Sequence, residues 1–305
     1  MNIVLFGSTD ITKLIADYLY NNGYTIAALV TTPEVFSISY ARERIRNSRY
    51  IDFSVWAKER NITILSYENA TKTLQDLTDL NISAEFAIVA GWYHIIPNIL
   101  RIFFTGGCAG FHASLLPNLR GGAPLNWAIL AGYKETGVSF FELSDGIDDG
   151  LLYDQERFLI EDGDYIQDLI YKSKKGILTI LDRTLPEIRE GSFSFKAQVG
   201  DISYCGQRKP EDSKINWNKP ALDIARLVRA SSLPYFGAYS FFDDRKITIW
   251  KADVSNTIFH ASPGQILIND KNVYVACGIQ ETINLIESDE MDMILKCNHR
   301  RFETL

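Results

Sequence analysis

His112 lies in the stretch GCAGFHASLLPNLRGGAPLNWAILAG, residues 107–132, between a glycine pair and a Ser-Leu-Leu-Pro turn. It is one of only four histidines in the chain. A histidine side chain in water has a pKa of about 6.5, so it can accept and return a proton near neutral pH, as general acid–base catalysis requires. A structural role, as a partly buried histidine beside a turn, explains the residue equally well. The surrounding residues must decide between the two interpretations.

An acidic loop follows in LSDGIDDGLLYDQ, where Asp145, Asp148 and Asp149 accompany two glycines. A tight turn accounts for one aspartate well, and for three less well. The spacing of the carboxylates is less regular than a Ca²⁺ or Mg²⁺ loop requires. The four cysteines are scattered, without the paired short spacing of a zinc site or a redox dithiol. We therefore predict buried free thiols and no metal site.

Two segments, GFHASLLPNLRGGAPLNWAILAG and TGVSFFELSDGIDDGLL, together resemble the signatures of the formyltransferases that use 10-formyl-tetrahydrofolate. In that family Asn-x-His precedes Ser-Leu-Leu-Pro, and Arg-Gly, Pro and a later Asp-x-Gly follow. The residues in register are His112, residues 114–117, Arg120, Gly121, Pro124, Asp148 and Gly150. QRKPEDSKINW and LVRASSLPYFGAYS look like the family's linker and smaller C-terminal domain, so the resemblance covers nearly the whole chain.

This resemblance implies a catalytic site built on His112 and Asp148. In the reaction an amine attacks the formyl carbon, negative charge develops on oxygen, and protons move from the amine and to the departing folate nitrogen. His112 is expected to carry protons, and Asp148 to orient the ring or help relay charge. Gly110 replaces the family's asparagine, whose amide donates a hydrogen bond to the oxyanion.

We expect a substitute for that donor at Gly110: a main-chain N–H, an ordered water or the protonated His112. We also expect Gly110 to have a positive φ or a backbone that faces the ligand, so that an added side chain would be strained.

The resemblance also assigns residues to the two substrates. Those expected to contact the folate are Gly91, Trp92, Leu116 and Ile147. Trp92 fits a core aromatic equally well. Arg120 is expected to meet a diphosphate of the acceptor, and Tyr235 to stack on its base, although Tyr235 also fits simple packing.

The elements that must hold these residues alternate between strands and helices. Apolar runs predict buried strands in NIVLF, TIAALVTT, ITILSY and FAIVAGW. Helical spacing predicts helices in DFSVWAKER and in the segment after a cap at Thr9 or Asp10 that ends at Gly23. We predict an α/β domain over residues 1–200, with a Rossmann-like, mostly parallel sheet covered by helices on both faces. Only Gly7 matches the three-glycine dinucleotide fingerprint, so no nicotinamide or flavin cofactor is expected.

The pattern changes after about residue 200. Short alternating runs, KITIWKADV, GQILIND and NVYVACG, predict a small β-rich, OB-like domain over residues 201–305. KPALDIARLVRASSLP reads as a helix that stops before Pro234. GSFSFKAQVGDISYCGQ is predicted to be a linker between the two domains.

Charge restricts the acceptor. The net charge is -7, and residues 205–305 hold 13 Lys and Arg against 13 Asp and Glu, so the basic surface expected of a tRNA-binding domain is missing. Glycinamide ribonucleotide formyltransferases usually have one domain, and GGAPLNWAIL looks more like the branch that formylates nucleotide-linked amino sugars. We therefore favour a nucleotide-diphosphate amino sugar as acceptor, 10-formyl-tetrahydrofolate as donor and a homodimer as assembly. Methionyl-tRNA formyltransferase is the alternative.

A non-enzymatic relative that binds folate or a nucleotide sugar without turnover is a third interpretation, because the asparagine is missing. Loss of one oxyanion donor typically costs about 10² to 10³ in rate, so His112 and Asp148 favour an enzyme. The N-terminus has no basic segment, and the apolar run FAIVAGWYHIIPNIL is broken before the roughly 20 residues that a membrane span needs. We expect a cytoplasmic protein with neither a membrane nor a nucleic-acid partner.

Overall fold

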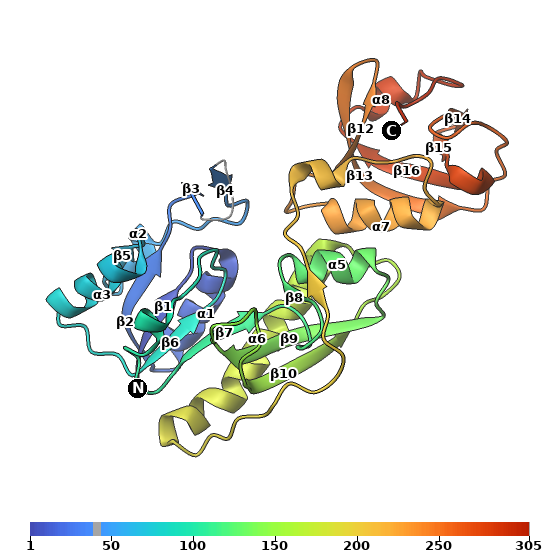
Figure 1. The fold of residues 1–305 in the computed structure, drawn as a ribbon. Coiled ribbons are helices and arrows are strands. Elements are labelled where there is room, and N and C mark those ends of the chain that lie inside the picture. The colour runs from blue at the N-terminus through green and yellow to red at the C-terminus, as the bar shows by residue number, and fades with distance from the viewer. Residues whose placement is uncertain (39–43, 305) are drawn as a thin grey trace. The chain divides into compact units, whose positions relative to one another are not determined.

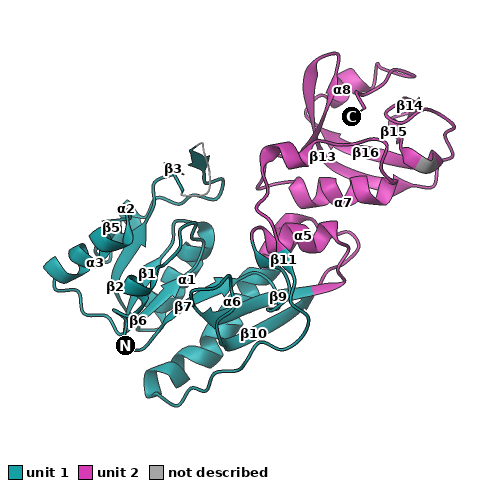
Figure 2. Cartoon of the chain, viewed as in Figure 1, with its two compact units in different colours: residues 1–121, 136–158, 172–204 teal, residues 122–135, 159–171, 205–305 magenta. Residues whose placement is uncertain are grey.

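The computed structural model describes residues 1–38 and 44–304 (Figure 1). Its contacts divide the chain into two compact units, each made of three segments (Figure 2). Unit 1 comprises residues 1–121, 136–158 and 172–204, and unit 2 comprises residues 122–135, 159–171 and 205–305. The predicted domain boundary after residue 200 stays a prediction.

Unit 1 is built on a seven-stranded sheet. Strands β1, β2, β5, β6 and β7 pair in parallel, and β9 pairs antiparallel with β7. The predicted α/β fold with a mostly parallel sheet is thereby confirmed. The order across the sheet is β10 (Leu152–Leu159), β9 (Glu135–Glu142), β7 (Cys108–His112), β6 (Phe86–Val89), β1 (Asn2–Phe6), β2 (Thr25–Thr31) and β5 (Ile64–Ser66).

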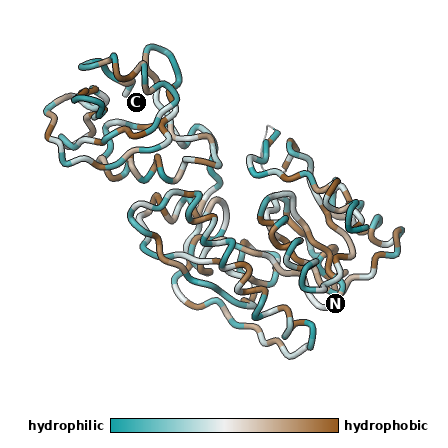
Figure 3. The backbone as a smooth tube through the Cα atoms, turned by 180° about the vertical axis from the view of Figure 1, so that it is seen from behind, coloured by the Kyte–Doolittle hydropathy of each residue, from teal (hydrophilic) through white to brown (hydrophobic). Residues whose placement is uncertain are grey.

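Helices cover both faces of this sheet because its central strands are apolar on both sides. In β1, Ile3 and Leu5 pack into one buried cluster while Val4 and Phe6 pack into another. The tube coloured by hydropathy shows the same strands as hydrophobic stretches (Figure 3). The helices on the first face are α1 (Asp10–Asn21), α2 (Ser54–Lys58) and α6 (Ile166–Glu190), and those on the second are α3 (Ala70–Asp79) and α4 (Asn98–Arg101).

Helix α1 begins where the sequence predicted. Thr9 is its N-cap, and Thr9 and Thr12 form a reciprocal capping box at the carboxyl end of β1. Short strands complete the unit. They are β3 (Val35–Phe36), which pairs with β4 (Ile45–Arg46), and β8 (Arg120–Gly121), which pairs with β11 (Tyr204–Cys205).

Unit 2 holds a five-stranded antiparallel sheet. Its order is β12 (Ala238–Phe242), β13 (Arg245–Ser255), β16 (Thr282–Ser288), β15 (Asn272–Ala276) and β14 (Ile266–Asn269). The predicted helix is α7 (Ala221–Ser231), which packs its apolar side onto β13. The β-rich C-terminal part is therefore confirmed. The remaining helices are α5 (Pro124–Leu130), α8 (Met291–Ile294), η1 (Pro210–Ser213) and η2 (Gly278–Gln280).

Three of the four cysteines are buried, as predicted, and Cys205 is half-buried instead. Burial raises the pKa of Cys108 and of Cys277 to about 12, so both thiols stay protonated at neutral pH. Among residues 1–38 and 44–304, no helix is both long enough and apolar enough to cross a membrane. Within the same ranges, no three His, Cys, Asp or Glu side chains are arranged to hold a metal ion.

Candidate active site

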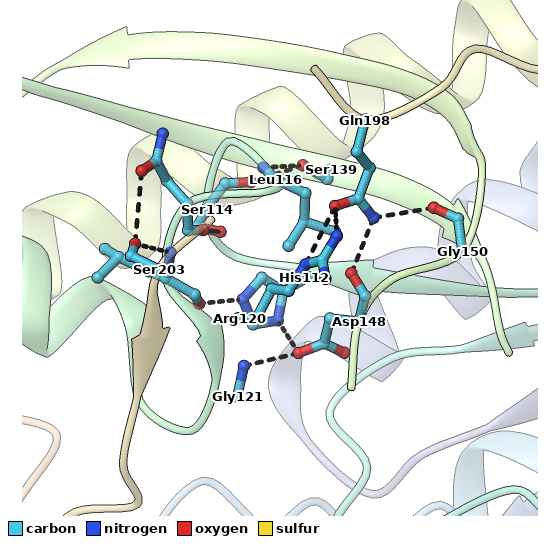
Figure 4. Close-up of polar contacts among 12 residues, drawn as sticks. His112, Ser114, Leu116, Arg120, Gly121, Ser139, Asp148, Gly150, Gln198 and Ser203 are labelled. Atoms are coloured by element: carbon cyan, nitrogen blue, oxygen red, sulfur yellow. Dashed lines mark hydrogen bonds and ion pairs between the residues drawn. The ribbon is translucent and has the colours of Figure 1, made fainter. Parts of the chain in front are cut away.

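His112 ends strand β7, and its ring is almost entirely buried. Its Nε2 lies 2.7 Å from the carbonyl oxygen of Leu119, and its Nδ1 lies 3.4 Å from Oδ2 of Asp148 (Figure 4). A carbonyl oxygen can only accept, so Nε2 carries a hydrogen and donates it. Both ring nitrogens thus face oxygen acceptors. This arrangement suits a ring that takes up a second proton at Nδ1, next to the carboxylate.

Asp148 lies in the loop between β9 and β10 and has a φ of 47°. Its Oδ2 also accepts a hydrogen bond of 2.8 Å from the main-chain N–H of Gly121. A left-handed backbone is costly for a residue other than glycine and persists only where neighbouring groups hold it. The structure therefore brings His112 and Asp148 together. Their catalytic roles stay predictions.

Gln198 holds the loop of Asp148 through the main chain of that loop. Its Nε2 donates to the carbonyl oxygens of Asp148 and Gly150, both at 2.8 Å (Figure 4). Sequence reasoning missed this residue, because Gln198 lies in the segment that was predicted to be a linker. A single side-chain amide that reaches 50 residues along the chain leaves no local pattern in the sequence.

Arg120 lies beside Gln198 and is 7% exposed. Its Nε and Nη2 donate to Oε1 of Gln198 at 3.2 and 2.6 Å, and its main-chain N–H donates to the carbonyl oxygen of Ser203 at 2.9 Å. The predicted contact of Arg120 with a diphosphate stays a prediction. In the structure its guanidinium is turned toward protein groups.

Gly110 lies in the middle of β7, paired with Val89 on one side and Phe141 on the other. It is not among the residues with positive φ, so the expectation of a positive φ at Gly110 was wrong. A Cβ at this position would lie 2.8 Å from Cδ2 of Leu143, so the flexible end of the Leu143 side chain would have to shift to admit a longer residue.

Leu116 belongs to the Ser-Leu-Leu-Pro turn and is 3% exposed. Its N–H donates to Oγ of Ser139 at 3.0 Å, and its carbonyl oxygen accepts from Nε2 of Gln155 at 2.9 Å. These bonds fix the turn between His112 and Arg120. The predicted contact of Leu116 with folate stays a prediction.

Gly91 and Trp92 follow strand β6. Gly91 has a φ of 64°, and a Cβ there would come within 1.9 Å of Oγ1 of Thr9, so contact with the cap of α1 already requires the glycine. Trp92 packs edge-to-face on Phe6 and Tyr67, and its buried Nε1 has no hydrogen-bond partner among the described residues. Packing thus accounts for both residues, and their folate contact stays a prediction.

The remaining predicted residues lie at the surface or in unit 2. Ile147 is 61% exposed in the acidic loop. The other two aspartates of that loop have protein partners: Asp145 pairs with Arg101, and Asp149 accepts from the Ser144 hydroxyl. Tyr235 lies in unit 2, in the turn that follows α7, and its predicted contact with the acceptor stays a prediction.

Comparison with known proteins identifies the family. A model described as formyl transferase matches residues 1–180, and one described as formyl transferase, C-terminal domain, matches residues 208–293. The methionyl-tRNA formyltransferase of Caldanaerobacter subterraneus subsp. tengcongensis is 31% identical over 294 residues, covering 94% of this chain and 91% of its own.

Two solved structures share the fold. The N-formyltransferase from Helicobacter canadensis, in complex with folinic acid and dTDP-3-aminofucose, has a TM-score of 0.68 at 16% identity and covers 93% of this chain and 98% of its own. The sugar 3N-formyltransferase WlaRD, solved with dTDP and 5-N-formyl-THF, has a TM-score of 0.67 at 19% identity. The match covers 95% of this chain and 98% of WlaRD. With both family models matched along its length, this chain belongs to the formyltransferase family, whose members are enzymes of one-carbon transfer.

Proposed function

We propose that this enzyme transfers the formyl group of 10-formyl-tetrahydrofolate to the amino group of a nucleotide-linked amino sugar. The observation that carries the chemistry is the His112 ring, with Nε2 anchored on Leu119 and Nδ1 facing Asp148. A buried imidazole next to a carboxylate is suited to hold a proton between two transfers.

Formyl transfer requires one proton to leave the attacking amine and one to reach the folate nitrogen as its bond to the formyl carbon breaks. The contact at Nδ1 is the longer of the two ring contacts, so Nδ1 is the atom proposed to exchange protons. Asp148 then stabilises the imidazolium while the proton resides there. With Nε2–H held by Leu119 and Nδ1–H directed at Asp148, both N–H groups of the ring are engaged, so the proposed donor to the oxyanion, in place of the family's asparagine, is a main-chain N–H or an ordered water.

The proposed folate site is the surface between residues 91–96 and the acidic loop. Arg101 links these two segments, because its Nη1 donates to the carbonyl oxygen of Ile96 at 2.8 Å and its Nη2 pairs with Asp145. Ile95 and Ile147 are 73% and 61% exposed in the two segments. Exposed apolar side chains beside main-chain polar groups suit a flat heterocycle such as a pterin.

The choice of an amino sugar as the acceptor rests on the charge of the protein. Residues 205–305 carry equal numbers of acidic and basic side chains, 13 of each, and the whole chain is at -7. A protein that holds a tRNA through its phosphates is expected to have a basic surface. Sugar N-formyltransferases share this fold, and one has been solved with a dTDP-amino sugar.

Methionyl-tRNA is the second candidate acceptor. It is favoured by the 31% identity to a methionyl-tRNA formyltransferase over 94% of this chain, a higher identity than that of the sugar enzymes named above.

One experiment separates these acceptors. The purified enzyme is incubated with 10-formyl-tetrahydrofolate and either dTDP-, UDP- and GDP-linked 3-amino and 4-amino sugars or charged initiator tRNA, and products are weighed by mass spectrometry. We expect a gain of one formyl group on an amino sugar and none with the His112→Ala enzyme. Formylation of the tRNA alone would overturn the sugar assignment. Binding of folate without turnover on any acceptor would indicate a non-enzymatic relative. Light scattering of the same preparation tests the expected homodimer.

A further inference from the structure

Gln198 is the single residue between 194 and 200 that is not exposed. The chain here follows α6, and the Gln198 side chain points toward Arg120 and the loop of Asp148 (Figure 4). Its amide makes four contacts of hydrogen-bond length: two with Arg120 through Oε1, and one each with the carbonyl oxygens of Asp148 and Gly150 through Nε2. Both hydrogens of the amide nitrogen are thus in use.

The orientation of this amide follows from its neighbours. A guanidinium has donors only, so Oε1 must face Arg120. Main-chain carbonyls have acceptors only, so the NH₂ group must face Asp148 and Gly150. Reversing the amide would oppose donor to donor and acceptor to acceptor at every contact. Arg120 therefore determines which way Gln198 points.

The two carbonyls that Gln198 holds flank the turn that aims the Asp148 carboxylate. Asp148 has the unfavourable φ of 47°, and Gly150 lies so close to the end of the preceding strand, β9, that a Cβ on it would be 1.8 Å from the carbonyl oxygen of Glu142. Such a turn needs bonds from outside the loop to keep its conformation. Gln198 supplies two, and the N–H of Gly121, the residue after Arg120, supplies a third to the carboxylate itself.

We propose that Arg120 and Gln198 are a pair of positioning residues that keep the Asp148 carboxylate directed at Nδ1 of His112. Arg120 fixes the orientation of the Gln198 amide. That amide holds the backbone of the loop, and the loop directs the Asp148 carboxylate at the histidine. The role in turnover rests on the proposed function, while the effect on the loop does not. Arg120 is thereby assigned to the protein's own loop instead of to a phosphate of the acceptor.

Gln198→Met tests the pair, because methionine nearly matches the volume of glutamine and makes none of the four contacts. Misplacing a reacting group by about 1 Å can cost about 10² in rate, so we expect kcat to fall by about tenfold to 10², with KM for the folate changed by less than about threefold. Arg120→Met is expected to behave alike, and the double variant no worse than either single variant. Loss of folate affinity with kcat unchanged would overturn the proposal.

A double-mutant cycle with Asp148→Asn distinguishes positioning from general damage. If Gln198 acts through Asp148, adding Gln198→Met to Asp148→Asn lowers kcat by less than about twofold further. Gln155→Met is the matched control. Gln155 is another half-buried amide of unit 1, which donates to Leu116 and Ser139 at 2.9 and 2.8 Å. In the double variant Gln155→Met with Asp148→Asn, the fold-decrease in kcat should equal the product of the two single fold-decreases. The same product for Gln198→Met with Asp148→Asn would contradict the proposal.

A crystal structure of Gln198→Met decides the positioning independently of any activity. We expect Asp148 to leave the positive φ region or its carboxylate to move away from His112, with the sheet unchanged. An unchanged loop would overturn the inference even if formyl transfer is established. Conversely, a wild-type enzyme that formylates none of the acceptors would refute the proposed function and leave the crystallographic result to judge the positioning pair.

Discussion

At the scale of single residues, the two contacts of the His112 ring are unequal. The Leu119 carbonyl holds Nε2 at 2.7 Å, whereas Asp148 lies 3.4 Å from Nδ1. The backbone thus fixes the ring, and the carboxylate faces the nitrogen that remains for chemistry.

Replacing His112 by Ala should lower turnover by at least about 10², the lower range for loss of a general acid–base group. Asp148→Asn should also be severe, because an amide cannot stabilise the imidazolium as a carboxylate does. Asp145→Asn and Asp149→Asn should be milder, since both side chains have partners outside the His112 contact. Steady-state kinetics measures the turnover of each variant, and calorimetry measures its affinity for folate. Nearly intact turnover in His112→Ala would place proton transfer elsewhere.

Gly110→Asn should not restore a missing donor. Its Cβ would meet Cδ2 of Leu143 at 2.8 Å, so the end of the Leu143 side chain must shift and the new amide must share the space beside it. We expect a small drop in melting temperature and turnover that is unchanged or reduced. Adding Leu143→Ala should recover stability and raise turnover above that of the single variant. A tenfold or greater increase in turnover from Gly110→Asn alone would contradict this account of the site.

His94 should make the protein less stable in mild acid. It packs against Phe36, Tyr67 and Trp92, and burial lowers its pKa below that of a histidine in water. The unfolded chain then binds the proton more tightly, so stability is full above about pH 6.5 and falls as the pH drops below it. His94→Phe should flatten this loss in urea unfolding at about pH 7 to 5. His260→Phe, at an exposed histidine, should keep the wild-type slope, and an identical slope in both variants would refute the assignment.

At the scale of elements, the carboxyl ends of β1 and β6 meet at one point. Gly91, just after β6, contacts Thr9, which caps α1, and Thr12 of the same cap donates to the carbonyl oxygen of Ala90 at 2.7 Å. The start of α1 is thereby fixed to the strand that leads into the proposed folate site.

Gly91→Ala should therefore be markedly destabilising. The added methyl group combines a φ of 64° with a 1.9 Å approach to Oγ1 of Thr9. Gly23→Ala is the matched control, because Gly23 has a φ of 75° but nothing within 4 Å of its Cβ. We expect Gly23→Ala to lower the free energy of unfolding by about 1–2 kcal/mol from backbone strain alone, and Gly91→Ala to lower it by more. Equal melting temperatures for the two variants would show that the contact with Thr9 is unimportant.

Strands β1, β2, β5 and β6 of unit 1 were predicted from sequence, whereas β7, β9, β10 and helix α6 were not. A strand buried on both faces is a continuous apolar run, as in β1, and can be read locally. Helix α6 spans 25 residues and contains Gly176 and Pro186, which both interrupt a helical pattern. Gly176 is tolerated because a Cβ there would already be 3.3 Å from Glu156 of β10, so the helix uses the glycine to approach the sheet.

The site was predictable only in part for a similar reason. His112 and Asp148 belong to motifs with fixed local spacing, so the sequence indicates them. Leu143 and Gln198 act by reaching across space to Gly110 and to the acidic loop. What fills the place of an absent side chain is decided by tertiary packing, which no local pattern records.

At the scale of the whole molecule, unit 2 is interrupted twice along the chain, yet its core is nearly contiguous. The buried residues of its core all lie between Ile215 and Phe302. Helix α5 adds two hydrogen bonds from outside that range, from Asn126 to Ala230 at 2.7 Å and from Trp127 to Gly206 at 2.8 Å.

A fragment of residues 201–305 should therefore fold by itself, with lower stability than a fragment to which residues 122–135 are rejoined. Circular dichroism during urea unfolding should show one cooperative transition. A fragment of residues 236–305 is the control and should not fold, because it lacks Ile224, Ala225 and Val228 of α7, which belong to the core. A gradual, non-cooperative change in the 201–305 fragment would count against the predicted domain boundary.

The contacts around His112 also bear on how the chain folds. Leu119 bonds to Ser203 across 84 residues and Arg120 to Gln198 across 78, separations similar to that between Ile3 and Phe86, where β1 pairs with β6. The site differs from the sheet in its order along the chain, because Gln198 and Ser203 lie in the segment after α6, beyond all seven strands of the sheet. Domains fold as the chain is made from its N-terminus. A newly made chain can therefore pair its sheet before it holds a complete site, and catalytic activity then reports that the segment after α6 has docked.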